Sequence, residues 1–446
     1  MNREILRLAI PNIISNITVP LLGMVDMFIV GHLEHSEYIG AIALANIIFN
    51  VIYMGFSFLR MGTSGFTAQA YGRADTNEQA NILFRSILVA AVSGLLIVLL
   101  QNVISSIGFY LLDAGMDVKT FAKEYFFIYI WAAPAVLGLS TMNGWFVGMQ
   151  NAKIPMYTAI VINVINIGLS FTLAYGFNMQ IKGVAWASVI AQYSGLTLSF
   201  IIWSLKYEWI RSYFNLQALK KWKDYVPFFK VNADIFIRTI ALVSVTTFFM
   251  SISAKMGDDI LAVNALLMQL FLLFSYIMDG FAYAAEALTG RFIGAKAIST
   301  LKLFVKRLFV WGIFLSATFT LIYALFTDEI LNLLTDKPSI ISISRQFQFW
   351  ALLMPLAGFS AFLWDSIFIG ATASKQMRNS MLIAVTVFFI ISLAFNENQN
   401  NHILWFAFII YLSLRGIIQA FMASTLLSKQ KELHTRHYKN SSSDKL

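Results

Sequence analysis

The chain has 446 residues, of which 58% are hydrophobic and 12% charged, and its formal net charge is +9. Because a soluble domain averages about 25% charged residues, this composition excludes an ordinary soluble protein and predicts one that crosses a membrane many times. The sequence has no cysteine, which excludes disulfides, thiolate nucleophiles and cysteine-ligated metals. The basic residues gather at the ends of apolar segments, so we attribute the net charge to membrane topology and not to a nucleic-acid partner.

Twelve apolar segments reach the length of roughly 20 residues that a membrane-spanning helix needs. The first is interrupted by Pro11 and Pro20 and lacks the short apolar run and cleavage site of a signal peptide, so we interpret it as a retained helix. In chain order the predicted spans are 7–31, 40–70, 82–110, 123–149, 155–177, 182–205, 227–254, 260–290, 301–327, 343–370, 379–395 and 401–427. The predicted fold is an all-α integral membrane protein with twelve transmembrane helices.

The last six segments repeat the first six at a constant offset of 222 residues, as in Gly72 and Gly294 (294 − 72 = 222). The other matches are 39–45 with 261–267, 65–67 with 287–289, and Phe146, Gly148 and Lys153 with Phe368, Gly370 and Lys375. Membrane proteins built from two copies of one helical bundle usually bind a substrate between the copies and work by rocking one against the other. The repeat therefore predicts a transporter.

Charges in the connections predict how the chain is oriented. Most Lys and Arg residues lie on the side that holds the N-terminus, which predicts that both termini are cytoplasmic. With six helices in each copy, the two lobes have the same orientation and are related by a pseudo-two-fold axis along the membrane normal. The predicted parts are an N-terminal lobe at 1–205, a basic linker at 206–226, a C-terminal lobe at 227–428, and a solvated, disordered cytoplasmic tail at 429–446.

The linker contains the basic run Lys220-Lys221-Trp222-Lys223. One interpretation is that this run contacts anionic lipids at the inner leaflet of the membrane. The alternative is that it only sets the topology and joins the two lobes.

Asp26 is a carboxylate inside the first predicted span, where an ionised group costs several kcal/mol and usually marks a transport pathway. The equivalent position of the second copy is Phe248 (26 + 222), so the helical repeat does not itself require a carboxylate. Such a group can hold a proton, or it can help to bind Na⁺ where neutral oxygens converge on it. The structural alternative is an acid at the outer end of the helix, close to His32.

Further charged residues lie at membrane depth in the second lobe. Asp234 and Arg238 are four residues apart and can pair on one helix face, either as a strut between helices or as a functional site. Asp365 aligns with Asn143 of the first lobe, and this polar match favours a shared structural role that ties neighbouring helices together. Arg415 lies in the last apolar segment, and the sequence does not assign it a partner.

Asp279 and Glu286 are seven residues apart and therefore share one helix face. Paired acids of this kind can bind a cation or relay protons. Alternatively, Glu286 braces the cytoplasmic end of its helix against Arg291 or Lys296.

These motifs resemble those of multidrug and toxic compound extrusion (MATE) transporters. Residues 25–31 and 40–45 resemble the family in general. The stretches 232–239, 279–290 and 365–373 are similar to its DinF-like branch, and the resemblance covers about residues 5–428.

The resemblance implies an ion-coupling site in the first lobe. The family's first-helix aspartate matches Asp26, a fifth-helix asparagine matches Asn166, and a sixth-helix hydroxyl matches Ser188. Where many relatives have a second aspartate, this chain has Ser170. The four residues can still ligate Na⁺, but the loss of one carboxylate lowers the negative charge that would hold it. We therefore expect protonation of Asp26, with Na⁺ as the open alternative.

The function implied is a secondary antiporter that exports cationic or amphipathic compounds in exchange for H⁺ or Na⁺. We expect no other cofactor or metal, contacts with membrane lipids, a monomer, and a place in the inner (plasma) membrane. Ion binding at Asp26 would bend or repack the first helix near Pro20 and Gly23 and release the substrate outward.

Three alternatives remain. A lipid-linked oligosaccharide flippase of the same superfamily would need a more cationic central cavity to hold pyrophosphate, whereas the charges at central depth are mainly acidic. An integral-membrane enzyme would need a nucleophile, base or metal cluster at one depth, and the sequence offers none. An open channel fits a two-copy architecture with isolated carboxylates least well.

Overall fold

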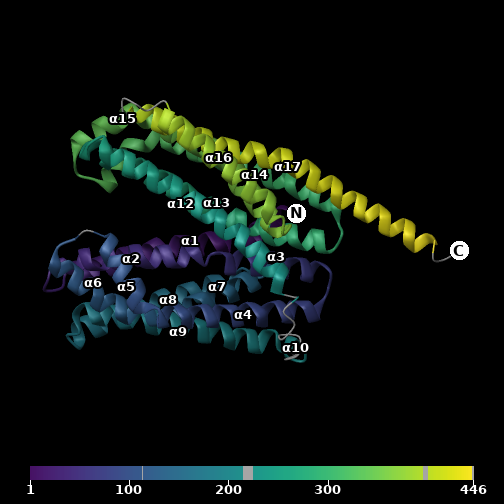
Figure 1. Ribbon diagram of the computed structural model, residues 1–446, viewed down its shortest axis with the longest axis horizontal. Helices are drawn as coiled ribbons and strands as arrows, with labels where there is room; N and C mark the ends of the chain where they lie inside the picture. Colours follow the sequence, from purple (N-terminus) through teal and green to yellow (C-terminus); the bar gives the residue numbers. More distant parts are fainter. Residues whose placement is uncertain (113, 214–222, 224, 395–399, 444–446) are drawn as a thin grey trace. The chain divides into compact units, whose positions relative to one another are not determined.

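The computed structural model describes residues 1–112, 114–213, 223, 225–394 and 400–443, with the side chains of residues 19, 22 and 424–443 excepted. Throughout these residues the chain is built from helices, and no strand occurs among them (Figure 1). The predicted all-α fold class is confirmed.

The helices of the first half are α1 (Asn2–Gly31), α2 (Glu37–Gly55), α3 (Phe58–Gly72), α4 (Thr76–Leu99), α5 (Gln101–Leu111), α6 (Met116–Tyr129), η1 (Ile130–Ala132), α7 (Ala133–Gly148), α8 (Lys153–Phe171), η2 (Thr172–Gly176), α9 (Gln180–Lys206) and α10 (Glu208–Arg211). Those of the second half are α12 (Tyr225–Lys255), α13 (Asp258–Gly294), α14 (Ile298–Leu334), α15 (Pro338–Gly370), α16 (Ser374–Ala394) and α17 (Asn401–Ser443).

Within the described parts of the chain, twelve stretches of helix are long and apolar enough to cross a membrane, as predicted. Three of them combine shorter elements: α2 with α3, α6 with η1 and α7, and α8 with η2. The span predicted at 82–110 is divided into α4 and α5. Helix α4 begins earlier than its apolar run because Asp75 caps it, accepting a hydrogen bond from the backbone N–H of Glu78 at 3.0 Å.

The chain divides into two compact units. We call Ile10–Phe229 the first lobe, and Met1–Ala9 together with Lys230–Leu446 the second lobe. The beginning of α1 belongs to the second lobe, where Glu4 accepts a hydrogen bond from Arg291 Nη1 at 3.2 Å. Of the predicted linker 206–226, residues 214–222 and 224 lie outside the described residues, and they include most of its basic run.

The predicted disordered tail differs from the structure. Helix α17 continues through the end of its span to Ser443, and residues 444–446 lie outside the described part. Residues 427–433, Leu-Ser-Lys-Gln-Lys-Glu-Leu, are mostly strong helix formers, so the helix can extend beyond its apolar part.

The 222-residue offset recurs in the backbone at helix ends. Helices α3, α7, α13 and α15 each end in a Schellman motif, in which one residue adopts a positive φ and the next N–H donates to the carbonyl five residues earlier at 2.8 to 3.0 Å. The residues with positive φ are Ala74, Gln150, Lys296 and Thr372. They are related in pairs by the repeat, since 296 − 74 and 372 − 150 both equal 222. The repeat is thus a property of the fold as well as of the sequence.

The matched glycines Gly148 and Gly370 occupy the same helix crossing in each lobe. A Cβ on Gly148 would lie 2.6 Å from Cβ of Thr67, and a Cβ on Gly370 would lie 3.0 Å from Cβ of Thr289. Thr289 is the repeat equivalent of Thr67 (67 + 222). Helix α7 therefore approaches α3 as closely as α15 approaches α13, because a side chain is missing at the same place.

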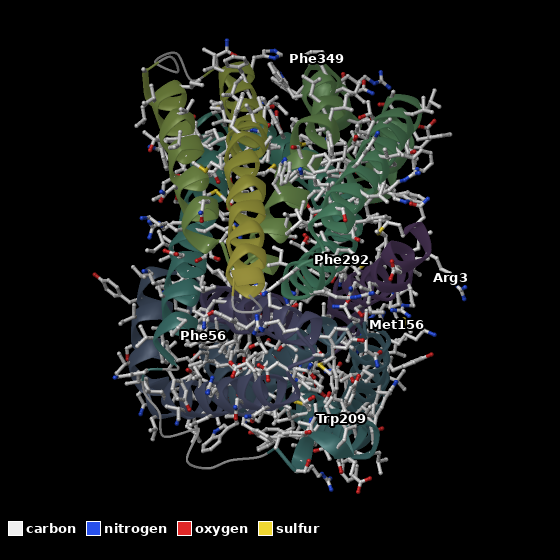
Figure 2. The ribbon with its side chains drawn as sticks, turned by 90° about the vertical axis from the view of Figure 1, so that its right-hand side faces the viewer. Arg3, Phe56, Met156, Trp209, Phe292 and Phe349 are labelled. Carbon is white, nitrogen blue, oxygen red and sulfur yellow. The ribbon has the colours of Figure 1, made fainter. Side chains whose placement is uncertain are left out.

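Large apolar side chains lie both inside the lobes and on their outer surfaces. In Figure 2, Phe349 projects away from the ribbon with 61% of its surface exposed, and Arg3 also points outward. Phe292, by contrast, is buried among the helices. An apolar exterior of this kind suits contact with lipid chains.

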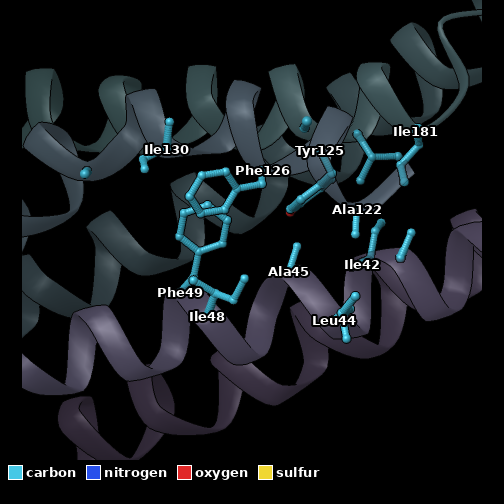
Figure 3. Packing of buried hydrophobic residues seen from close by; sticks show 14 of the residues in the cluster. Ile42, Leu44, Ala45, Ile48, Phe49, Ala122, Tyr125, Phe126, Ile130 and Ile181 are labelled. Carbon is cyan, nitrogen blue, oxygen red and sulfur yellow. The ribbon is translucent and has the colours of Figure 1, made fainter. Parts of the chain in front are cut away.

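Aromatic packing fixes helix α6 in the first lobe. Phe126 of α6 stacks on Phe49 of α2 with ring centroids 5.1 Å apart (Figure 3). Tyr129 meets Phe49 edge-on, with ring centroids 4.7 Å apart. Tyr125, one turn before Tyr129, belongs to the same buried cluster. These contacts hold two tyrosines of α6 in place for the polar site described next.

Candidate functional site

Asp26 lies on α1, within the first membrane-spanning stretch. Its side chain is half-buried, and the buried Oδ1 atom has no hydrogen-bond partner among the residues that the structure describes. Most buried polar groups in proteins are hydrogen-bonded, so an unpartnered carboxylate oxygen requires an explanation. A proton or a cation on this oxygen would supply one.

Two tyrosines of α6 connect Asp26 to the rest of the site. Tyr125 and Tyr129 are both close enough to Asp26 to interact with it electrostatically. The Tyr125 side chain is also close enough to Ser188 on α9 to interact with it. Asp26 and Ser188 therefore share Tyr125 as a neighbour.

Ser188 also joins α9 to α8. Asn166 Nδ2 donates a hydrogen bond to Ser188 Oγ at 2.8 Å, and that hydroxyl donates to the carbonyl oxygen of Val184 at 3.0 Å. Asn166 Oδ1 and the hydroxyl of Ser170, one turn further along α8, are buried with no partner in the described part of the chain. The structure thus brings together Asn166 and Ser188, two residues of the proposed ion site, and leaves oxygen atoms of Asn166 and Ser170 without a partner among the described residues.

Helix α1 is tethered on both sides of Asp26. Asn163 Nδ2 of α8 donates to the carbonyl oxygen of Thr18 at 3.0 Å, and the hydroxyl of Tyr175 in η2 donates to the carbonyl oxygen of Ile29 at 2.9 Å. These bonds connect α1 directly to the helix that carries Asn166.

The predicted bending residues lie between the two tethers of α1. Pro20 is inside the helix, where it cannot donate the usual backbone hydrogen bond. A Cβ added at Gly23 would meet no other atom within 4 Å. The segment around Pro20 and Gly23 is therefore weakly bonded and loosely packed, but α1 is continuous through it.

In the second lobe, the Asp365 carboxylate is the centre of a hydrogen-bonded charge network. Its carboxylate accepts hydrogen bonds from Arg238 on α12, from Arg415 at 2.7 Å and from Gln419, both on α17. Asp365 has 3% of its surface exposed and Arg415 4%. Buried charges are retained when they are paired and hydrogen-bonded, and these contacts tie α12, α15 and α17 together.

Asp234 and Arg238 pair with residues of other helices and not with each other, although their spacing would allow such a pair. Asp234 accepts hydrogen bonds from Ser374 Oγ at 2.7 Å and from Arg378 Nη1 at 2.5 Å, both on α16. Arg238 instead forms its ion pair with Asp365. Each of the two charges is thus compensated by an opposite charge on another helix, as a charge inside a membrane protein requires.

Asp279 and Glu286 both lie on α13, two turns apart. Glu286 is fully buried, whereas Asp279 is half-buried and within electrostatic range of Tyr276. Arg291, one of the two cations considered for Glu286, forms an ion pair with Glu4.

Several residues of these sites were not predicted from the sequence. Tyr125 and Tyr129 of the first lobe, and Ser374, Arg378 and Gln419 of the second, were not singled out. The available signal was spacing: Tyr125 with Tyr129, and Arg415 with Gln419, are each four residues apart and so share a helix face.

Twelve apolar helices in two repeated halves, with a carboxylate in a spanning helix, define a polytopic membrane protein of the transporter class. A family model described as MatE matches the chain twice, at residues 11–172 and 235–396. The chain therefore belongs to the MatE family of multi-pass membrane proteins.

Individual relatives agree with this assignment. DNA damage-inducible protein F of Escherichia coli (strain K12) is 34% identical over 430 residues, which cover 93% of this chain and 90% of that protein. A probable multidrug resistance protein NorM of Thermotoga maritima is 20% identical over 353 residues, or 77% and 75% of the two chains. The resemblance to the DinF-like branch of the MATE transporters is confirmed.

Solved structures show the same fold. A crystal structure of MATE in the bent conformation superimposes with a TM-score of 0.83 at 18% identity, covering 97% of this chain and 96% of that one.

Proposed function

We propose that this protein is a secondary antiporter that exports cationic or amphipathic organic compounds in exchange for H⁺ or Na⁺, with the ion bound at Asp26. Family membership supports the transporter class, and the NorM relative is named as a multidrug resistance protein. The proposal extends to a monomer in the plasma membrane with both termini in the cytoplasm, as the distribution of Lys and Arg predicts.

The observation that carries the proposal is the buried, unpartnered Oδ1 of Asp26 within a spanning helix. A permanent ion pair would leave such a carboxylate charged in every state. Without one among the described residues, Asp26 can exist with and without a bound cation, and the two forms differ by a full charge in a medium that strongly disfavours charge. A difference of this kind is what couples ion binding to a change of conformation.

The tethers of α1 offer a way to transmit that difference. Asn163 and Tyr175 hold α1 on either side of Asp26, and the segment around Pro20 and Gly23 between them is loosely packed. Loading Asp26 would change the helix where it bends most easily. The surroundings of α1 in the first lobe would change shape with it and release the substrate.

Between the two ions, the composition of the site favours H⁺. Asp26 is the one carboxylate of the proposed set, and Ser188 Oγ already engages Asn166 and Val184. Unused oxygens on Asn166 and Ser170 keep Na⁺ as the alternative for the test. The flippase gains no support, because the buried Arg415 and the partly buried Arg238 and Arg378 are all paired with carboxylates.

The test is efflux of a cationic dye from cells that lack their own pumps, under separately imposed H⁺ and Na⁺ gradients. We expect wild-type efflux to follow one gradient and Asp26→Asn to lose it. Asp258→Asn, which removes the same charge from an exposed position at the start of α13, is the matched control. Equal efflux by wild type and Asp26→Asn would remove Asp26 from the mechanism.

A further inference from the structure

A cavity of about 350 Å³ lies in the first lobe, away from Asp26 and its neighbours. It lies where the last turns of α3 and the first turns of α4 meet the beginning of α12. These are the ends of three membrane-spanning stretches, so the cavity is at the level of a membrane surface. By the predicted topology, this surface is the cytoplasmic one.

The charged residues that line the cavity are mainly basic. Arg73, Arg85 and Lys223 contribute three positive charges, and Glu78 contributes one negative charge. Arg85 is buried, donates to Glu78 at 3.3 Å and lies over the ring of Tyr225. Arg73 and Lys223 are exposed and form no ion pair with any residue that the structure describes. The cavity therefore has positive charge in excess.

The cavity also has an apolar part. Phe66 of α3 and Phe228 of α12 face each other with ring centroids 6.0 Å apart, and Ile82 and Pro227 extend this surface. A small inorganic anion would gain nothing from contact with these rings. A ligand with an anionic head and an apolar body would use both parts.

We infer that this cavity is a binding site for the phosphate headgroup of an anionic membrane phospholipid. Arg73 and Lys223 bind the phosphate, Arg85 is held beside them by Glu78, and the first part of the acyl chains lies against Phe66 and Phe228. Basic pockets at the ends of transmembrane helices commonly bind such headgroups. The inference does not depend on the proposed antiport.

The site has a structural consequence for the inter-lobe connection. Lys223, Pro227 and Phe228 precede Lys230, where the chain passes into the second lobe. A headgroup bound to Arg73 and Lys223 would fix the beginning of α12 against α3 and α4.

The test uses the purified full-length protein titrated with phosphatidylglycerol, with bound lipid counted by native mass spectrometry. We expect the double variant Arg73→Ala/Lys223→Ala to bind phosphatidylglycerol about tenfold to thirtyfold more weakly than wild type, since each interfacial cation contributes about 1 kcal/mol. Phosphatidylcholine should bind weakly to both proteins. Both substituted residues are exposed, so the unfolding temperature should not change; if it does, the single variants Arg73→Gln and Lys223→Gln replace the double variant.

The matched control is Lys302→Ala/Lys306→Ala, which removes the same charge from exposed positions of α14 on the same predicted side. It should keep wild-type binding of phosphatidylglycerol. An equal loss in the control would mean a general charge effect and overturn the site, as would unchanged binding in Arg73→Ala/Lys223→Ala. Binding of inorganic phosphate with the same dependence on Arg73 and Lys223, without binding of phosphatidylglycerol, would overturn the lipid as the ligand.

Discussion

Asp26 of the first lobe and Asp365 of the second have opposite surroundings, although the lobes are copies of one pattern. Asp365 and Asp234 of the second lobe each hold an arginine of another helix, and Asp365 holds two. Asp26 of the first lobe has a buried oxygen with no partner in the described chain. A saturated carboxylate is a fixed connection, whereas an unsaturated one can gain and lose a cation. Asp365 is therefore a structural charge of the second lobe, and under the proposed function Asp26 is the charge that varies.

The largest effect expected from this comparison is a loss of folding stability when Asp365 is substituted. Asp365→Asn should destabilise the protein by about 3–5 kcal/mol, because it leaves Arg238 and Arg415 buried without a counter-charge. Asp26→Asn should keep or slightly raise stability, because it removes a buried charge that has no partner. Thermal unfolding in detergent would measure both variants, and a similar loss in both would break the distinction between the lobes.

Glycine contacts provide a second, smaller contrast. Gly370→Ala should cost about 1–3 kcal/mol, because its Cβ would lie 2.3 Å from the carbonyl oxygen of Glu286, which is backbone and cannot easily move. Gly23→Ala meets no atom within 4 Å and should stabilise the folded state by up to about 1 kcal/mol. Thermal unfolding in detergent would measure both glycine variants. If Gly23→Ala were as costly as Gly370→Ala, the segment around Gly23 would not be loosely packed.

Adding a second carboxylate to the first lobe would sharpen the assignment of the ion. Ser170→Asp should make dye efflux more dependent on Na⁺, with about a tenfold lower concentration for half-maximal effect, because a second negative charge attracts a cation to the site. Thr120→Asp, which turns an exposed hydroxyl residue of α6 into a carboxylate, is the control for adding the same charge outside the site. Efflux that stays independent of Na⁺ in Ser170→Asp would favour H⁺ as the coupling ion of the wild type.

The smallest predicted effect concerns the Schellman motifs shared by the lobes. Thr372 has a φ of 52°, which is costly for a β-branched residue, so Thr372→Gly should stabilise the protein by about 0.5–1 kcal/mol. Ala74→Gly should give a smaller gain at the matching type of cap. Thr386→Gly, in the middle of α16, should be destabilising and serves as the control. A gain for Thr386→Gly equal to that for Thr372→Gly would contradict the explanation from φ.

The sequence by itself determined the class of fold and the repeat. Twelve long apolar segments can be satisfied only by helices in a bilayer, since each backbone polar group must be bonded within its own segment. The offset of 222 residues predicted equivalent positions that the backbone then shared, from Ala74 with Lys296 to Gly148 with Gly370. The sequence also showed that Asp26 is a carboxylate within a predicted span. The family resemblance added Asn166 and Ser188 as predicted site residues.

Only the tertiary structure decided which residues pair with the charged side chains inside the membrane. Helical periodicity shows that Asp234 and Arg238 share a face, but it does not show which other helices that face meets; the structure pairs them with Arg378 and Asp365. In the same way, nothing in the local sequence separates Asp365, which is saturated, from Asp26, which is not. Spacing along one helix is a local property, whereas the satisfaction of a buried charge depends on side chains from helices distant in the chain.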